Sequence, residues 1–213
     1  MPGRAPNKRR LGVDERRAEL LELGLELFAR APYETLSIDA IARAAGISKG
    51  LLYHYFPSKR DYYAATVHLA ADRLLSASLE ATESDDLPPL ELLHRGLSAY
   101  LDFVERHGQT YAALLRTGIG TDPEILTVIE GTRDAFVDRI AARIGLGLES
   151  QGPLLRLALR GWVGFVEVTS LSWLNESTIS REVLAELMSE TLLATLSSAS
   201  LKLPQIADDR SSE

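Results

Sequence analysis

A single glycine, Gly46, strongly constrains the fold of this chain, because it separates two short apolar segments that each begin with a serine. Ser37 precedes the first segment and Ser48 precedes the second, and serine is favoured at the position just before a helix. Glycine is favoured in the left-handed conformation that ends a helix. The pattern therefore predicts two short helices joined by a tight turn, which is a helix-turn-helix.

Helical patterns continue on both sides of this turn. In residues 14–30 leucines recur at helical spacing, and Pro32 ends that pattern. Ser58, with Asp61 three residues later, forms a capping-box pattern that begins a long helix to about residue 81. No segment alternates apolar and polar residues as a half-buried strand does, so we predict an all-α fold of about nine helices. The remaining predicted helices cover residues 89–106, 110–116, 123–144, 153–175 and 181–199.

Charge is unevenly distributed along the chain. Residues 1–60 contain 11 Lys or Arg and 7 Asp or Glu, whereas residues 61–213 contain 12 and 23. A basic N-terminal part on an acidic body is consistent with localised phosphate contact, but a chance fluctuation explains the asymmetry equally well. The basic residues 4–10 have two interpretations: an arm that reaches a minor groove or flanking phosphates, or a solvated tail.

Several functional classes find no support in the sequence. No apolar run approaches the roughly 20 residues that span a bilayer, and the basic start lacks the apolar block of a signal peptide, so we expect a cytoplasmic protein with no membrane partner. The chain has no cysteine. The four histidines, His54, His68, His94 and His107, lie on different predicted segments without metal-ligand spacing. Because nucleophile and phosphate-binding motifs are also missing, we predict no enzyme activity, no metal and no cofactor.

The second helix of the turn carries side chains that suit DNA recognition. Lysine donates to guanine in the major groove, and tyrosine or histidine reaches phosphates or bases. Gly50 permits close approach to the DNA backbone, and Lys59, at the start of the following helix, suits a phosphate. The alternative is that the aromatic residues merely pack a three-helix corner, and Phe56 is expected in the core. The candidate DNA contacts are Ser37, Ser48, Lys49, Gly50, Tyr53, His54, Tyr55 and Lys59.

Residues 35–62 resemble the signature of the TetR family of bacterial transcriptional regulators. The matching positions are Ala42, Ala45, Gly46, Ile47, Ser48, Gly50, Leu52, Tyr53, Tyr55, Phe56 and Lys59. The resemblance implies a homodimeric repressor that binds a palindromic DNA operator and is released by a small molecule. By position, the phosphate contacts would be Tyr53 and Lys59, and the groove-facing residues would be Lys49, Gly50, His54 and Tyr55. We divide the chain into a DNA-binding domain, residues 1–58, and an effector-binding and dimerisation domain, residues 59–213.

The last two predicted helices have apolar surfaces that suit a homodimer. Residues 153–175 are apolar nearly all round, so this helix must be buried on several sides. The last helix carries a stripe formed by Leu184, Leu187, Met188, Thr191, Leu192 and Thr195. With the symmetry-related pair, the two helices would form a four-helix interface, as the resemblance implies. A dimer places a second head about 34–36 Å away, where it reads the other half of the operator.

A pocket for a small hydrophobic effector is expected beneath the long apolar helix. The candidate effector-binding residues are Tyr100, Phe103, Tyr111, Trp162, Phe165 and Glu167. Alternatively, each aromatic residue packs in the hydrophobic core without contacting a ligand. A carboxylate such as Glu167 amid apolar neighbours needs a partner, and we expect an arginine of its own chain or of the partner subunit. Two other functions remain open: a helical carrier of hydrophobic ligands that does not bind DNA, and an activator of the same family.

Overall fold

The computed structural model describes residues 12–83, 87–116, 122–143, 148–176 and 178–208, with side chains described except in 109–116, 148–152, 176 and 200–208. In this part of the chain every regular element is a helix, which confirms the predicted all-α fold. The elements are α1 (Val13–Arg30), a 3₁₀ turn (Tyr33–Thr35), α2 (Ile38–Ala44), α3 (Lys49–Tyr55), α4 (Lys59–Glu80), α5 (Pro89–Arg116), α6 (Pro123–Arg143), α7 (Leu148–Glu176) and α8 (Arg181–Asp208).

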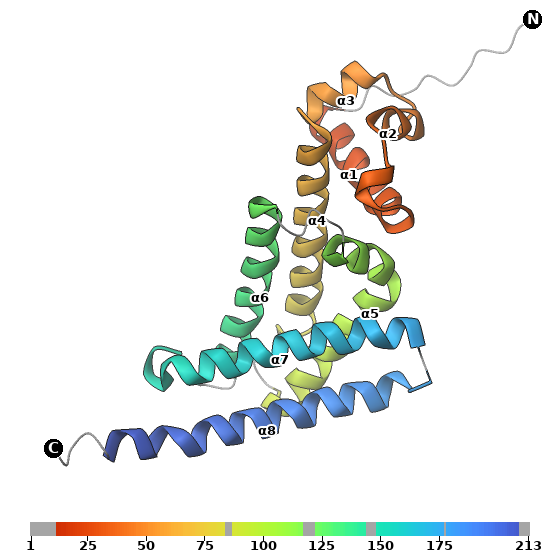
Figure 1. Cartoon of the computed structure of the whole chain (residues 1–213). Coiled ribbons are helices and arrows are strands. Elements are labelled where there is room, and N and C mark those ends of the chain that lie inside the picture. The colour runs from red at the N-terminus through yellow and green to blue at the C-terminus, as the bar shows by residue number, and fades with distance from the viewer. Residues whose placement is uncertain (1–11, 84–86, 117–121, 144–147, 177, 209–213) are drawn as a thin grey trace, which may run out of the picture.

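Helices α1, α2 and α3 form a head at one end of the molecule, and α4 runs from this head into a helical body (Figure 1). Helix α6 lies beside α4 within the body, and the antiparallel pair α7 and α8 crosses the far end (Figure 1). The head is not attached through α4 alone, because α1 also packs against α5.

The local geometry of the head follows from its caps. The Ser37 hydroxyl accepts a hydrogen bond from the Ala40 N–H at 3.1 Å, and the Ser48 hydroxyl accepts one from the Leu51 N–H at 3.2 Å. Gly46 has a φ of +65°, the left-handed conformation that glycine adopts without a steric penalty. Ser37 therefore begins α2, Gly46 lies in the turn after α2, and Ser48 begins α3, as the sequence predicts.

Two apolar cores lie along the length of α4. The first joins the three head helices to Tyr62 and Tyr63 of α4, and it includes the fully buried Ile125 from the start of α6. Phe56 belongs to this core with 2% of its surface exposed, as predicted. The second core begins at Leu74 and fills the body. Helix α4 therefore contributes to both cores.

Helices α1 and α4 approach closely at Gly24. A Cβ on this residue would lie 2.5 Å from the Thr66 hydroxyl oxygen and 2.9 Å from the Tyr62 hydroxyl oxygen. The Tyr62 hydroxyl, which is fully buried, donates a hydrogen bond to the Leu20 carbonyl in the preceding turn of α1. The contact fixes α1 against the first half of α4.

Some helix boundaries predicted from the sequence are wrong. The structure has a single helix α5 where two helices, over residues 89–106 and 110–116, were expected. Gly108 does not end α5, because its role is in packing: a side chain there would overlap Leu174 of α7. Helix α7 also begins before Pro153, since a proline removes one hydrogen bond without necessarily ending a helix. The described residues therefore form eight α-helices.

Candidate nucleic-acid interface and ligand cavity

Helix α3 presents one face to solvent and one to the head core. Leu52 is fully buried, whereas Lys49, Gly50 and His54 are exposed and Tyr53 has 42% of its surface exposed. A Cβ placed on Gly50 would meet no atom within 4 Å, so the backbone on this side of α3 is open. The exposed face has the polar and aromatic composition that major-groove recognition uses.

The lysine on this face has a carboxylate partner. Lys49 Nζ lies 3.1 Å from Asp39 Oδ2, and both side chains are exposed. Beside it, the His54 ring meets the Tyr55 ring edge-on at 5.5 Å, and Tyr55 also packs against the head core. Binding of DNA through Lys49 would have to replace the contact with Asp39. Sequence patterns did not indicate this pair, although Asp39 lies in the first turn of α2.

Lys59 stands at the first position of α4 and is held against an aromatic ring. Its Nζ lies 4.0 Å from the centre of the Tyr33 ring, a distance at which a cation is attracted by the ring face. Burial lowers the pKa of Lys59, and Glu34 acts in the opposite direction. The two capping serines, Ser37 and Ser48, are exposed.

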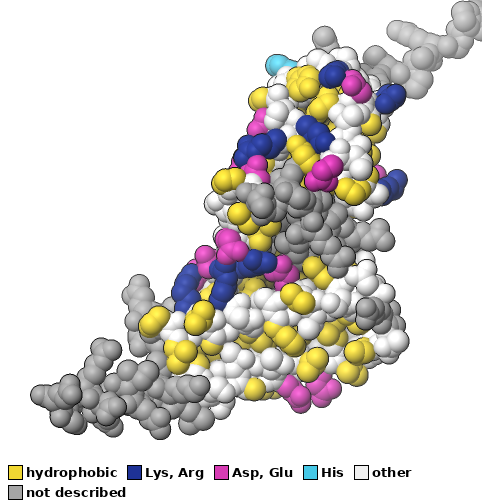
Figure 2. Space-filling view, in the orientation of Figure 1, with side chains coloured by type: hydrophobic (Ala, Val, Ile, Leu, Met, Phe, Trp, Pro, Cys, Tyr) yellow, Lys and Arg dark blue, Asp and Glu magenta, His cyan; other side chains and the backbone are white. Residues whose placement is uncertain are grey.

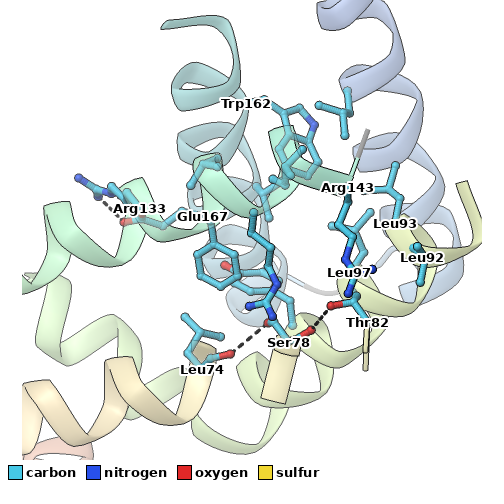
Figure 3. Close-up of a pocket in the computed structure, with 18 of the residues that line it drawn as sticks. Leu74, Ser78, Thr82, Leu92, Leu93, Leu97, Arg133, Arg143, Trp162 and Glu167 are labelled. Carbon is cyan, nitrogen blue, oxygen red and sulfur yellow. Dashed lines mark hydrogen bonds and ion pairs between the residues drawn. The ribbon is translucent and has the colours of Figure 1, made fainter. Parts of the chain in front are cut away.

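A cavity of about 450 Å³ lies in the body among α4, α5, α6, α7 and α8. Of the predicted effector-binding residues, Tyr100, Trp162 and Glu167 line it, and the last two are visible in Figure 3. Phe103 and Phe165 belong to the surrounding core and are not among the lining residues. The side chain of Tyr111 lies outside the described part of the chain.

Glu167 obtains its partner from its own chain. Arg133 of α6 donates to both carboxylate oxygens of Glu167, from Nε at 2.8 Å and from Nη2 at 2.6 Å. This paired geometry satisfies a carboxylate that is 8% exposed. Arg133 also reaches Glu130, so the pair is continuous with a charged group between α6 and α7, visible below the middle of Figure 2. The alternative of a partner-subunit arginine is not needed.

Three arginines of α6 line the cavity and were not predicted from the sequence, namely Arg133, Arg139 and Arg143. A signal for them exists in the sequence. Ile129 and Phe136, which also line the cavity, fall on the same helical stripe as the arginines. Charged residues within the apolar stripe of an amphipathic helix suggest a polar group facing inward.

The outer surfaces of α7 and α8 contain exposed apolar side chains. On α7, Leu157 is 69% exposed and Val168 is 64% exposed, and nothing lies within 4 Å of a Cβ placed on Gly161 or Gly164 between them. On α8, Val183 and Leu187 are exposed. Three residues of the stripe predicted for partner contact are instead buried in the chain's own core, namely Leu184, Met188 and Leu192. The prediction is wrong at these positions because they face α7 and α5.

The start of α4 is tied directly to the start of α6. The Arg60 guanidinium donates to both carboxylate oxygens of Asp122, one bond measuring 2.7 Å, and lies 3.0 Å from Glu124. The hydrogen bond from Arg60 lowers the pKa of Asp122. Asp122 also caps α6 by accepting from the Glu124 N–H at 3.0 Å. This contact joins α4, the helix that begins at Lys59, to a helix of the cavity wall.

The described residues contain no group of three or more His, Asp or Glu side chains arranged to hold a metal ion. No helix among them combines the length and apolar character that crossing a membrane requires.

Comparison with known proteins follows this division into head and body. A sequence profile described as "Bacterial regulatory proteins, tetR family" matches residues 20–66, and one described as "Tetracyclin repressor-like, C-terminal domain" matches residues 89–195. The HTH-type transcriptional activator FasR of Mycolicibacterium smegmatis is 29% identical over 168 residues, covering 78% of this chain and 75% of FasR. The regulator EthR of the same species is 27% identical over 191 residues, covering 86% and 83%.

A crystal structure of a TetR-family transcriptional regulator from Streptomyces coelicolor has the same fold, with a TM-score of 0.77 and 32% identity, covering 93% of this chain and 87% of the other. The proteins of this family are DNA-binding transcriptional regulators, which confirms the prediction that the chain is not an enzyme. Profiles of the head and of the body, together with these relatives, agree with the signature around Gly46. The chain belongs to the TetR family of bacterial regulatory proteins.

Proposed function

We propose that this chain is a cytoplasmic, ligand-responsive transcriptional repressor that binds a palindromic double-stranded DNA operator as a homodimer. A small hydrophobic effector in the body cavity releases it. The observation that carries this proposal is that an exposed α3 face and a separate cavity of about 450 Å³ are connected within one chain by α4 and α6. An apolar cavity of this size suits a drug-sized ligand.

The proposed DNA contacts are those on and beside α3. Tyr53 is exposed, and Lys59 holds its charge close to the surface at the start of α4, so both suit phosphates. Lys49, Gly50 and His54 occupy the exposed side of α3 and suit base edges in the groove. Ser37 and Ser48 already accept capping hydrogen bonds, and their hydroxyl hydrogens remain to donate to phosphate.

We assign the dimer interface to the outer faces of α7 and α8. A line of exposed apolar and small residues on α7 runs from Leu157 through Gly161 and Gly164 to Val168, at the i, i+4, i+7, i+11 spacing of one helical face. Glycines allow the backbone of a second helix to approach closely. Val183 and Leu187 extend the apolar surface onto α8. Two such pairs form a four-helix interface, and the dimer carries two heads.

Effector binding acts on the heads through α6. The cavity side of α6 includes Ile129, Arg133 and Phe136, while its capping residue Asp122 is bound to Arg60 on α4. A ligand that favours a shifted α6 therefore favours a shifted α4, and the spacing of the two α3 helices changes. A coupling free energy of roughly 1–3 kcal/mol changes operator affinity about 5–150-fold.

An activator is a second candidate, because FasR, one of the similar proteins, is named a transcriptional activator. Selection of bound DNA from a random library tests the common part of both candidates. A two-fold symmetric site bound by dimers supports the proposal, and failure to select any sequence contradicts it. The position of the selected site relative to a promoter, followed by transcription in vitro, separates repression from activation.

A further inference from the structure

Two arginines give one part of the cavity wall a positive charge. Arg139 and Arg143 lie one turn apart on α6, and both line the cavity. Figure 3 shows Arg143 beside Thr82 and Leu97, on the other side of the cavity from Arg133 and Glu167. The cavity is therefore chemically polarised, with the Arg139–Arg143 end distinct from the rest.

The electrostatics of these arginines favour an anion. Burial lowers the pKa of Arg139, and the neighbouring Arg143 lowers it further because each positive charge disfavours the other. Glu83 acts in the opposite direction, raising the pKa. Arginine nevertheless stays charged in proteins, so two guanidinium groups partly removed from water face the same space. A bound anion would offset their repulsion and the loss of hydration.

Three other polar side chains of the wall, those of Glu167, Ser78 and Thr82, have partners within the chain. Glu167 is bound by Arg133 through two hydrogen bonds. The hydroxyl groups of Ser78 and Thr82 donate to carbonyl oxygens of the preceding turn of their own helix segment, at 3.0 and 2.8 Å (Figure 3). The surface left to contact a ligand is largely apolar and includes Leu92, Leu93, Leu97, Trp162, Val166 and Leu192.

We infer that the effector is an amphipathic anion, in which an apolar chain or ring system carries one carboxylate or phosphate group. The oxygens of this group bind Arg139 and Arg143, and the apolar part extends along the wall toward Trp162. Guanidinium groups bind carboxylate and phosphate alike through paired N–H donors. This inference rests on the proposed function, since it names the ligand class of the same cavity.

Calorimetric titration of the purified full chain with decanoate, decyl phosphate and decanol tests the inference, each ligand being kept below the concentration at which it forms micelles. The three share one apolar chain and differ in the head group. We expect at least one of the two anions to bind roughly 10- to 100-fold more tightly than decanol, because hydrogen bonds between charged groups contribute a free energy of this size. The better anion identifies which oxyanion the site takes.

Two variants and a matched control locate the effect. Arg139→Gln and Arg143→Gln are expected to reduce the affinity for the anion to that for decanol, with decanol binding unchanged. Arg156→Gln removes an exposed arginine of α7 that pairs with Asp134 and Asp138 and does not line the cavity, so it should bind all three ligands as the original chain does. If a glutamine variant does not fold, Arg139→Lys is tested in its place, and this variant should weaken binding of the anion without changing binding of decanol.

Equal affinity for decanol and for both anions, or unchanged anion affinity in the folded arginine variants, would overturn the inference. Operator binding is measured in parallel, without ligand. A chain that binds its operator but does not distinguish decanoate from decanol retains the proposed function and loses only the ligand class. A chain that binds the anions through Arg139 and never binds DNA contradicts the proposed function instead.

Discussion

Arg60 and Asp122, which are 62 positions apart in the sequence, form a two-bond contact between the first turn of α4 and the cap of α6. Arg60 directly follows Lys59, so the contact lies beside one of the proposed DNA contacts. At its other end, α6 supplies Arg139 and Arg143 to the cavity. The cavity wall is thus connected to the head through the backbone of α6 and the hydrogen bonds between Asp122 and Arg60.

The first prediction concerns the pH dependence of stability. Asp122→Asn keeps an oxygen that caps α6 but removes the charge that binds Arg60. The hydrogen bond from Arg60 holds the folded-state pKa of Asp122 below its ordinary value of 3.8, so this residue stabilises the fold above that pH and ceases to do so as the pH falls through the folded-state pKa. Urea midpoints of the two proteins should differ at neutral pH and converge in acid.

A control for this experiment is Glu91→Gln, which breaks an exposed pair with Arg95 on α5. Exposed i, i+4 pairs contribute little, so its urea midpoint should stay close to that of the original chain at every pH. A difference between Asp122→Asn and the original chain that does not change with pH would contradict the electrostatic explanation.

The second prediction separates phosphate contacts from base contacts. Tyr53→Ala and Lys59→Ala should weaken binding to all DNA sequences alike, because phosphates carry no sequence information. Lys49→Ala should instead relax the preference at one base-pair position by about 1–3 kcal/mol. Competition binding with a library of single-base operator variants measures both effects. Arg95→Ala, on the body, is the control, and identical profiles for all three head variants would disprove the assignment of roles.

The third prediction concerns Asp39, the carboxylate paired with Lys49, which is a proposed DNA contact. Asp39→Asn removes the carboxylate charge that pairs with Lys49 at 3.1 Å. Lys49 then does not have to give up this ion pair to bind DNA, and a negative charge that would repel the phosphates is lost. Operator affinity should rise, most clearly at low salt, where exposed charges are least screened. Measurement of affinity against salt concentration checks this, and a weaker complex at low salt would show that Asp39 orients Lys49 productively.

The fourth prediction compares two glycines of the head. Gly24→Ala should lower the free energy of unfolding by about 1–3 kcal/mol, because the added methyl group meets the buried Thr66 and Tyr62. Gly50→Ala has open space and should leave stability equal or slightly higher, since alanine favours helix, while DNA affinity falls. Thermal unfolding and operator binding of both variants are the measurements; equal stability losses would contradict the packing at Gly24.

The fifth prediction tests the dimer interface. Leu157→Glu and Val168→Glu place charges on the exposed apolar face of α7 and should produce folded monomers with much weaker operator binding, because one head buries too little surface for strong specific binding. Sedimentation velocity and circular dichroism distinguish monomers from unfolded chains. Leu79→Glu changes a leucine of α4 that is 45% exposed, and this control should remain dimeric. Dimeric α7 variants would show that the interface lies elsewhere.

The head was predictable in detail because its signals are local. Ser37, Gly46 and Ser48 each act through backbone groups within three residues, so their effect on the chain is readable without tertiary context. The burial of Phe56 followed from the same short motif. The Lys49–Asp39 pair was not foreseen, since it depends on the angle between two helices, which the sequence specifies only through packing.

The body was less predictable because its important contacts connect distant segments. A break was predicted between residues 106 and 110, but Gly108 lies within α5 and accommodates Leu174 of α7, which lies 66 positions later in the sequence. The inward orientation of Arg139 and Arg143 depends on how α6 rotates against α4 and α7. Trp162 and Phe165 lie three residues apart on the same side of α7, yet only Trp162 lines the cavity, and helical periodicity alone does not distinguish them.

The sharing of α4 between the two cores has a practical meaning for protein engineering. Tyr62 and Tyr63 complete the first core and Leu74 the second, so a cut at the loop before Lys59 would transplant a head without the tyrosines that fill it. Chimeric biosensors built from this chain should exchange the segment through Ala70 together with the first turns of α6. Heads from relatives whose α4 carries smaller residues than these tyrosines will need compensating changes in α1.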